Sequence, residues 1–176
     1  ILSGTEIRRY SIAISWFWFL GATYLTQFPN LAKHIFNANE QVVTLFLMMF
    51  TVGVAAGSAI CGKILHNKIT TRFAPYAALA LVIFGTDFFI AAKSITASEN
   101  VLNISAFLAR GFVSYRLLFD LCMTAVAGGI FYVPLYAKVQ ELIPLGKRAR
   151  VMGGIGFLNA VFMVFSSLIG MALLAA

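Results

Sequence analysis

Charged residues are scarce in this sequence. Only 11% of its 176 residues are Asp, Glu, Lys or Arg, whereas 61% are hydrophobic and the mean hydropathy is +0.91. A soluble domain carries about 25% charged residues, so this class is excluded. Apolar runs of about 20 residues recur along the chain, each long enough to cross a hydrocarbon core. The sequence therefore predicts an all-α membrane protein.

Residues that commonly perform chemistry are also few. The only cysteines, Cys61 and Cys122, both lie in apolar runs, which indicates neither a disulfide framework nor a metal site. The two histidines, His34 and His66, lie in connectors predicted on opposite sides of the membrane, so they cannot share a metal ion. No P-loop, GxSxG or paired-cysteine motif is present. We therefore expect no enzyme activity, no cofactor and no metal in this segment.

Five hydrophobic segments are predicted to span the membrane: 10–32, 41–65, 74–92, 115–137 and 151–174. The connector before the fourth segment is long and partly apolar. Its "VLNISAFLARGF" predicts either a short helix on the membrane surface or an extension of a neighbouring span. Because the chain begins without Met, we expect residues 1–176 to be a single transmembrane domain from a longer protein.

The basic residues predict how the spans are oriented. The formal net charge of +7 would suggest nucleic acid as a partner of a soluble protein, but here Lys and Arg lie between spans and orient them, so no nucleic acid is expected. With the N-terminus in the cytoplasm, nine of the 13 basic residues lie at inner ends and four at outer ends. The inner ones are Arg8, Arg9, Lys63, Lys68, Arg72, Lys138, Lys147, Arg148 and Arg150, and the outer ones are Lys33, Lys93, Arg110 and Arg116.

Two carboxylates, Asp87 and Asp120, lie inside apolar runs. A charge at the bilayer centre costs about 2.5–3.5 kcal/mol, so such residues usually face a bundle interior or water. Both are near the predicted outer ends, since Asp87 lies about 9 Å along a helix from Lys93 and Asp120 about 6 Å from Arg116. Arg116, one turn from Asp120, can pair with it, whereas Asp87 needs a partner on another helix, such as Arg116 or Arg110. A structural ion pair and a substrate or coupling-ion site both stay open.

Two amides complete the polar candidates within the spans. Gln27 lies near the outer end of the first span, and Asn159 lies in the fifth. Hydrogen bonding to a neighbouring helix is the ordinary role of such side chains. A contact with substrate is the alternative.

Glycines and a proline predict close packing and a bend. Gly53 and Gly57 stand four residues apart in the second span, which lets two helix backbones approach closely. Gly128, Gly129 and Pro134 in the fourth span all weaken a helix. We therefore expect the fourth span to bend there, as a section of a gating helix.

Several stretches, taken in order, resemble one family. They are "ISWFWFLGATYLTQFPNLAK" (14–33), "EQVVTLFLMMFTVGVAAGS" (40–58), "FGTDFF" (84–89), "RLLFDLCMTAVAGGIFYVPLYAKVQ" (116–140) and "KRARVMGGIGFLNAVFMV" (147–164). They resemble the second half of the major-facilitator domain of bacterial lysophospholipid transporters, especially of those fused to a phospholipid acyltransferase and an acyl-carrier ligase. The likeness covers most of the chain.

The resemblance implies twelve spans in two six-helix halves, of which this segment holds the seventh to the eleventh. It implies movement of lysophospholipid from the outer to the inner leaflet of the bacterial inner membrane, where it is re-acylated. Asp87, Asp120 and Arg116 are then expected to receive the zwitterionic head group, and the coupling ion is either a proton or sodium. One departure is that the inner loop "GKILHNKITTR" lacks the acid that the family often carries there, which puts a gating ion pair on that acid in doubt.

Two other functions stay open on the sequence. One is a major-facilitator carrier of another small solute, which would have a similar composition. The other is a membrane anchor that transports nothing and holds a fused acyltransferase at the lipid surface. A pure anchor needs neither buried acids nor a Gly–Pro bend, which favours transport.

Overall fold

The computed structural model describes residues 4–65, 69–95, 98 and 100–175, so His66 and Lys68 lie outside the described part. Its elements are helices and one isolated β-bridge, between Ala38 and Leu102. The long helices are α1 (Thr5–Asn30), α2 (Glu40–Leu65), α3 (Ala74–Lys93), α5 (Phe112–Leu142) and α6 (Arg148–Ala175). The short ones are η1 (Leu31–Ile35), α4 (Ile104–Leu108) and η2 (Leu145–Lys147). The predicted all-α membrane fold is confirmed, and the five long helices coincide with the five predicted segments.

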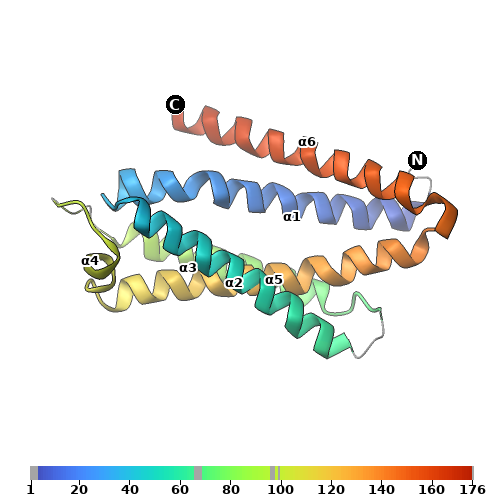
Figure 1. The fold of residues 1–176 in the computed structure, drawn as a ribbon, viewed down its shortest axis with the longest axis horizontal. Coiled ribbons are helices and arrows are strands. Elements are labelled where there is room, and N and C mark those ends of the chain that lie inside the picture. Colours follow the sequence, from blue (N-terminus) through green and yellow to red (C-terminus); the bar gives the residue numbers. More distant parts are fainter. Residues whose placement is uncertain (1–3, 66–68, 96–97, 99, 176) are drawn as a thin grey trace.

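Four described helices are long and apolar enough to cross a membrane. They cover Glu40–Ile64, Ala74–Lys93, Phe112–Leu142 and Leu145–Leu173. Helix α1 is not among them, because hydroxyl, phenol and indole side chains alternate with its apolar residues and lower its hydropathy. It nevertheless lies beside the other helices along most of its length (Figure 1). The count of five membrane spans therefore stays a prediction.

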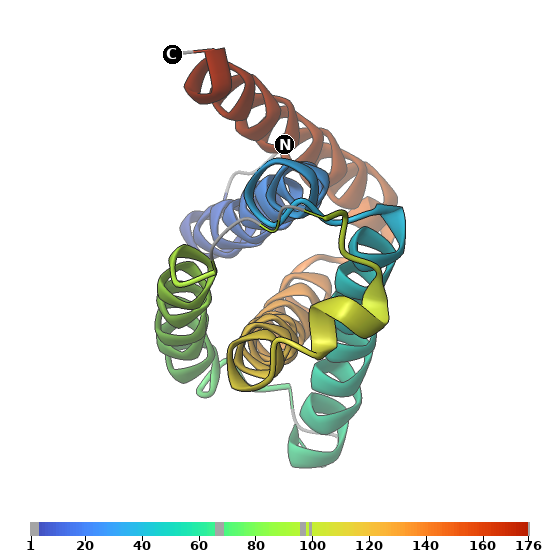
Figure 2. The same cartoon turned by 90° about the vertical axis from the view of Figure 1, so that its left-hand side faces the viewer.

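Helix α5 is the centre of the bundle, with α1, α2 and α3 packed around it (Figure 2). Its Leu117, Leu121 and Val139 are completely buried. Helix α6 packs along α1, where the Thr23 and Ser166 hydroxyls lie 2.7 Å apart. Helices α1 and α6 run parallel, whereas α5 runs the opposite way, as expected for helices that cross a membrane alternately.

Helices α2 and α5 cross at backbone contact. A Cβ atom on Gly57 would stand 2.1 Å from the Val126 carbonyl oxygen, and one on Gly53 would stand 2.6 Å from the Cys122 carbonyl oxygen. Across the same contact, a Cβ on Gly129 would meet backbone atoms of α2 at 2.7 Å. The close approach predicted from the glycines of α2 is confirmed.

The residues predicted to bend α5 lie within a continuous helix, and its two glycines contact neighbouring helices. The helix runs from Phe112 to Leu142 without a break and includes Pro134. Gly129 is needed for the contact with α2, and a Cβ on Gly128 would stand 2.8 Å from the ring of Phe17 on α1. Packing thus explains both glycines, and a bend with a gating role stays a prediction.

The described end of the connector before α5, residues 100–111, packs against one end of the bundle (Figure 2). Asn103 caps α4, since its Oδ1 accepts a hydrogen bond from the Ala106 N–H at 2.8 Å. Phe107 of α4 is completely buried against Phe36 and Phe46. Gly111, at φ 76°, then turns the chain into α5. The connector was predicted to form either a short helix or an extension of a neighbouring span. Both occur in part, because α4 is a short helix and α5 begins at Phe112 instead of residue 115.

The predicted orientation can be measured on two residues in the connectors before and after α5, Asn103 and Lys147. We expect Asn103→Cys to react with a membrane-impermeant thiol reagent from outside and Lys147→Cys only from inside, because the positive charges favour a cytoplasmic N-terminus. Both are introduced into a full-length protein whose Cys61 and Cys122 are replaced by Ala. Opened membranes, in which both positions should react, provide the control. Labelling of both from one side of sealed membranes contradicts the model.

Candidate functional site

An ion pair joins α3 to α5. The Arg116 guanidinium donates from Nε to Asp87 Oδ2 at 3.0 Å and from Nη2 to Asp87 Oδ1. This two-point contact is the geometry in which arginine holds a carboxylate most firmly. Both side chains keep about a third of their surface exposed, 35% for Arg116 and 36% for Asp87. The prediction that Asp87 finds its partner on another helix is confirmed.

Asp120 lies beside this pair and is far more buried than either of its members. It is 2% exposed, and its Oδ2 has no hydrogen-bond partner among the described residues. The expected pairing of Asp120 with Arg116 was wrong, because the hydrogen bonds of the guanidinium go to Asp87. The nearby charges that act on Asp120 are those of Asp87 and Arg116. Two acids thus lie next to one cation, and only Asp120 of the three is fully buried.

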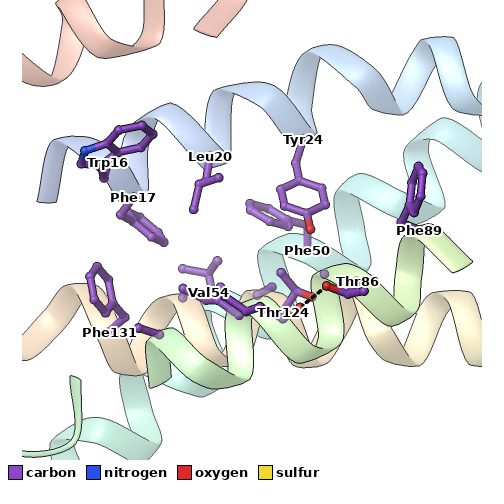
Figure 3. A pocket seen from close by; sticks show the side chains of 17 residues that line it. Trp16, Phe17, Leu20, Tyr24, Phe50, Val54, Thr86, Phe89, Thr124 and Phe131 are labelled. Carbon is purple, nitrogen blue, oxygen red and sulfur yellow. Dashed lines mark hydrogen bonds between the residues drawn. The ribbon is translucent and has the colours of Figure 1, made fainter. Parts of the chain in front are cut away.

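A cavity of about 560 Å³, which we call the main cavity, lies between α1, α2, α3 and α5. Figure 3 shows its lining, which is mostly aromatic and aliphatic and includes Trp16, Phe17, Leu20, Phe50, Val54 and Phe131. Hydroxyls come from Tyr24, Thr86 and Thr124. Thr86 donates to the Val82 carbonyl at 2.7 Å, whereas Thr124 Oγ1 is buried without a hydrogen-bond partner in the described part of the chain.

Two smaller cavities adjoin the main cavity, towards opposite ends of α1. One, of about 360 Å³, shares Ala78 and Phe131 with it and adds Glu6, Arg9 and Tyr10. The other, of about 330 Å³, shares the Leu20, Tyr24, Gly85 and Phe89 side of it and adds Gln27 and Asn30. Together they form a row between α1 and α3, which we call the α1–α3 cleft. It is apolar in the middle, charged at the Glu6 end and amide-lined at the other.

The structure brings three of the five predicted site residues together. Asp87, Arg116 and Asp120 form one cluster, but none of them lines the three cavities. Their expected contact with a head group therefore stays a prediction. Gln27 stands apart in the α1–α3 cleft, where its Oε1 accepts a hydrogen bond from Asn30 Nδ2 at 3.2 Å.

Asn159 joins α6 to α1. Its side-chain amide lies 2.8 Å from the Ser15 hydroxyl. In the orientation that satisfies both amide atoms it also accepts a hydrogen bond from Trp18 Nε1 at 3.3 Å. The ordinary role expected of this residue, a hydrogen bond to a neighbouring helix, is confirmed.

Sequence reasoning predicted Gln27 but missed the hydroxyls and the charged end of the cleft. Thr124 follows Asp120 by four residues, a spacing that places both on one face of α5 and that was available as a signal. The charged end at Glu6 and Arg9 depends on how α1 lies against α3, which no local pattern reveals. Among the described residues, no group of three or more His, Cys, Asp and Glu side chains is placed to hold a metal ion.

Comparison of the chain with protein-family models, with curated proteins and with solved structures finds no match. The function is therefore argued from the cleft, the buried acid and the residues that carry the family resemblance.

Proposed function

We propose that this chain is a segment of a membrane transporter that moves lysophospholipid from the outer to the inner leaflet of the bacterial inner membrane, where it is re-acylated. The observation that carries the proposal is the α1–α3 cleft. The 560 Å³ of its main cavity falls in the range of about 300–1,000 Å³ typical of ligand sites. The four helices around it include three that are apolar enough to span a membrane.

The composition of the cleft favours a lipid over a polar solute. A sugar needs a hydrogen-bond partner for most of its hydroxyls, because each polar group buried without one costs free energy. The main cavity supplies few hydroxyls among aromatic and aliphatic walls. A single acyl chain has no such need and gains from apolar contact. The cleft thus suits the tail of a lysophospholipid.

The charged end of the cleft suits a zwitterionic head group. The Arg9 guanidinium is a good partner for a phosphate, and the Glu6 carboxylate is one for an ammonium group. In the predicted orientation this end faces the cytoplasm, where re-acylation takes place. The head group would then leave the transporter at Glu6 and Arg9. The substrate path of such a carrier is completed by the other half of the transporter, which the resemblance places before this segment.

Filling the main cavity tests the proposal. Gly21 lines that cavity, and a Cβ on it meets no described atom within 4 Å. We expect Gly21→Leu, in the full-length protein, to fold normally and to lower lysophospholipid uptake into membrane vesicles about tenfold or more, since a filled site costs a bound ligand on the order of 1–3 kcal/mol.

The matched control for this experiment is Gly62→Leu. It adds the same side chain to α2 at a position that lines none of the three cavities and is open among the described atoms. Uptake should be unchanged in this variant. Normal uptake by well-folded Gly21→Leu would overturn the assignment of the cleft to lipid. Inhibition of wild-type uptake by a sugar to the same extent as by unlabelled lysophospholipid would overturn it too.

A further inference from the structure

We propose that Asp120 is the proton-carrying group of this protein. It holds a proton while Arg116 is bound to Asp87, and it gives the proton up when Arg116 turns towards it. The link to transport rests on the proposed function, whereas the protonation of Asp120 does not.

The first support is that Asp120 is buried without the hydrogen bonds that a buried carboxylate needs. A buried carboxylate needs several hydrogen bonds to stay charged, and the Asp120 Oδ2 atom has none among the described residues. The two hydrogen bonds that Arg116 makes, from Nε and Nη2, both go to Asp87. The Asp87 carboxylate is the acid that acts on Asp120 from the neighbouring helix. A proton on Asp120 makes the three-residue cluster neutral.

The charges that act on Asp120 come from α3 and from its own helix. From α3 it is faced by Asp87, and on its own helix Arg116 stands one turn away. From α1, the Tyr24 phenol lines the main cavity together with Thr124, which lies one turn beyond Asp120 on α5. The stretch of α2 that crosses α5, residues 45–57, contains no titratable side chain.

A proton fits this position better than a metal cation. Sodium sites in transporters take carbonyl oxygens from unwound sections of helix. Helix α5 is continuous from Phe112 to Leu142, so the carbonyls around Asp120 are engaged in helix hydrogen bonds. The neighbouring Arg116 guanidinium also repels a cation. A proton needs only one acceptor, and Asp87 provides it.

The spacing of Arg116 and Asp120 makes the cluster a switch. Four residues apart, they share one face of α5, so the guanidinium can reach Asp120 when α3 moves away from α5. The Asp120 O–H bond then breaks, the proton passes to water, and Arg116 pairs with the new carboxylate. Thr124, buried without a partner one turn on, lines the main cavity and provides a route for the proton towards it.

Infrared difference spectroscopy on the full-length protein in lipid tests the inference. We expect wild type at neutral pH to show the carbonyl band of a protonated carboxyl group, and Asp120→Asn to lose it. Asn is close in shape to the protonated acid, so this variant should fold as well as wild type. Glu141→Gln is the matched control, because Glu141 is exposed and paired with Lys138 at 2.8 Å, and it should keep the band. A wild-type spectrum equal to that of Asp120→Asn overturns the inference.

A second measurement separates the proton from sodium. The melting temperature of wild type is recorded at fixed pH in sodium chloride and in choline chloride, and it should be the same in both. Stabilisation by sodium that is absent from Asp120→Asn would assign the site to a metal ion and overturn the proposal. A carboxyl band in a protein that takes up no lysophospholipid would support the protonation of Asp120 and overturn the proposed function instead.

Discussion

A Gly57→Leu variant will lose most of its stability, because α2 and α5 can no longer cross. The added Cβ would stand 2.1 Å from the Val126 carbonyl oxygen and 2.9 Å from its Cα. These are backbone atoms of a helix and cannot turn aside as the end of a side chain does. Overpacking a core costs about 1–3 kcal/mol when neighbours adjust, and here whole helices must separate. A domain stability of about 5–15 kcal/mol leaves little reserve for such a loss.

The measurement is thermal unfolding of the full-length protein in detergent, with the folded fraction taken from size-exclusion chromatography. Gly57→Ala should fall between wild type and Gly57→Leu, since it adds the clashing atom without the rest of the side chain. Gly156→Leu is the control, because a Cβ on this exposed glycine of α6 meets no described atom within 4 Å. Equal melting of Gly57→Leu and Gly156→Leu would contradict the assigned crossing.

The local signals in the sequence predicted the helices and this crossing. Long apolar runs specify helices that span a membrane, because only a continuous helix satisfies its backbone there without neighbours. Gly53 and Gly57 lie on one face by helix geometry alone, so a close neighbour was predictable. Which helix would fill that space was not, since nothing near them in the sequence refers to α5.

The arrangement of the site depends on contacts between distant parts of the chain. Arg116 has one acid a turn away on its own helix and another 29 residues distant, and it takes the distant one. Local spacing favoured Asp120, but the packing of α3 against α5 places Asp87 where Nε and Nη2 of the guanidinium both reach it. Likewise the α1–α3 cleft requires residues of four helices, so no single stretch predicts it.

The low hydropathy of α1 has the same origin. Its polar side chains lower its hydropathy, yet they make hydrogen bonds to another helix and line the cleft. Ser15 and Thr23 contact α6 by hydrogen bonds, and Tyr24 extends into the main cavity (Figure 3). By composition alone, α1 is a weaker candidate for a membrane span. In the structure, its polar side chains contact α6 and line the main cavity.

Removal of the positive charge of Arg116 will destabilise the protein more than removal of both members of its ion pair. Arg116→Gln leaves the charged Asp87 next to Asp120 without a cation. Taking away one partner of a partly buried pair strands the other charge, here beside a buried acid, whereas replacing both is often tolerated. We therefore expect thermal unfolding in detergent to place Arg116→Gln lowest, with Asp87→Asn/Arg116→Gln restored towards wild type. If the single and the double variant melt alike, the pair does not hold α3 to α5.

Uptake in the same variants separates a structural pair from a switch. Lys138→Gln/Glu141→Gln removes an exposed pair whose contribution should be small, and it controls for the loss of two charges. If the Asp87–Arg116 pair only fastens α3 to α5, its well-folded double variant will take up lysophospholipid at the wild-type rate. We expect the opposite, folding with little uptake, because Arg116 is then missing as the cation that draws the proton from Asp120. Near-normal uptake by that variant would leave Asp87 and Arg116 as architecture and remove the switch from the mechanism.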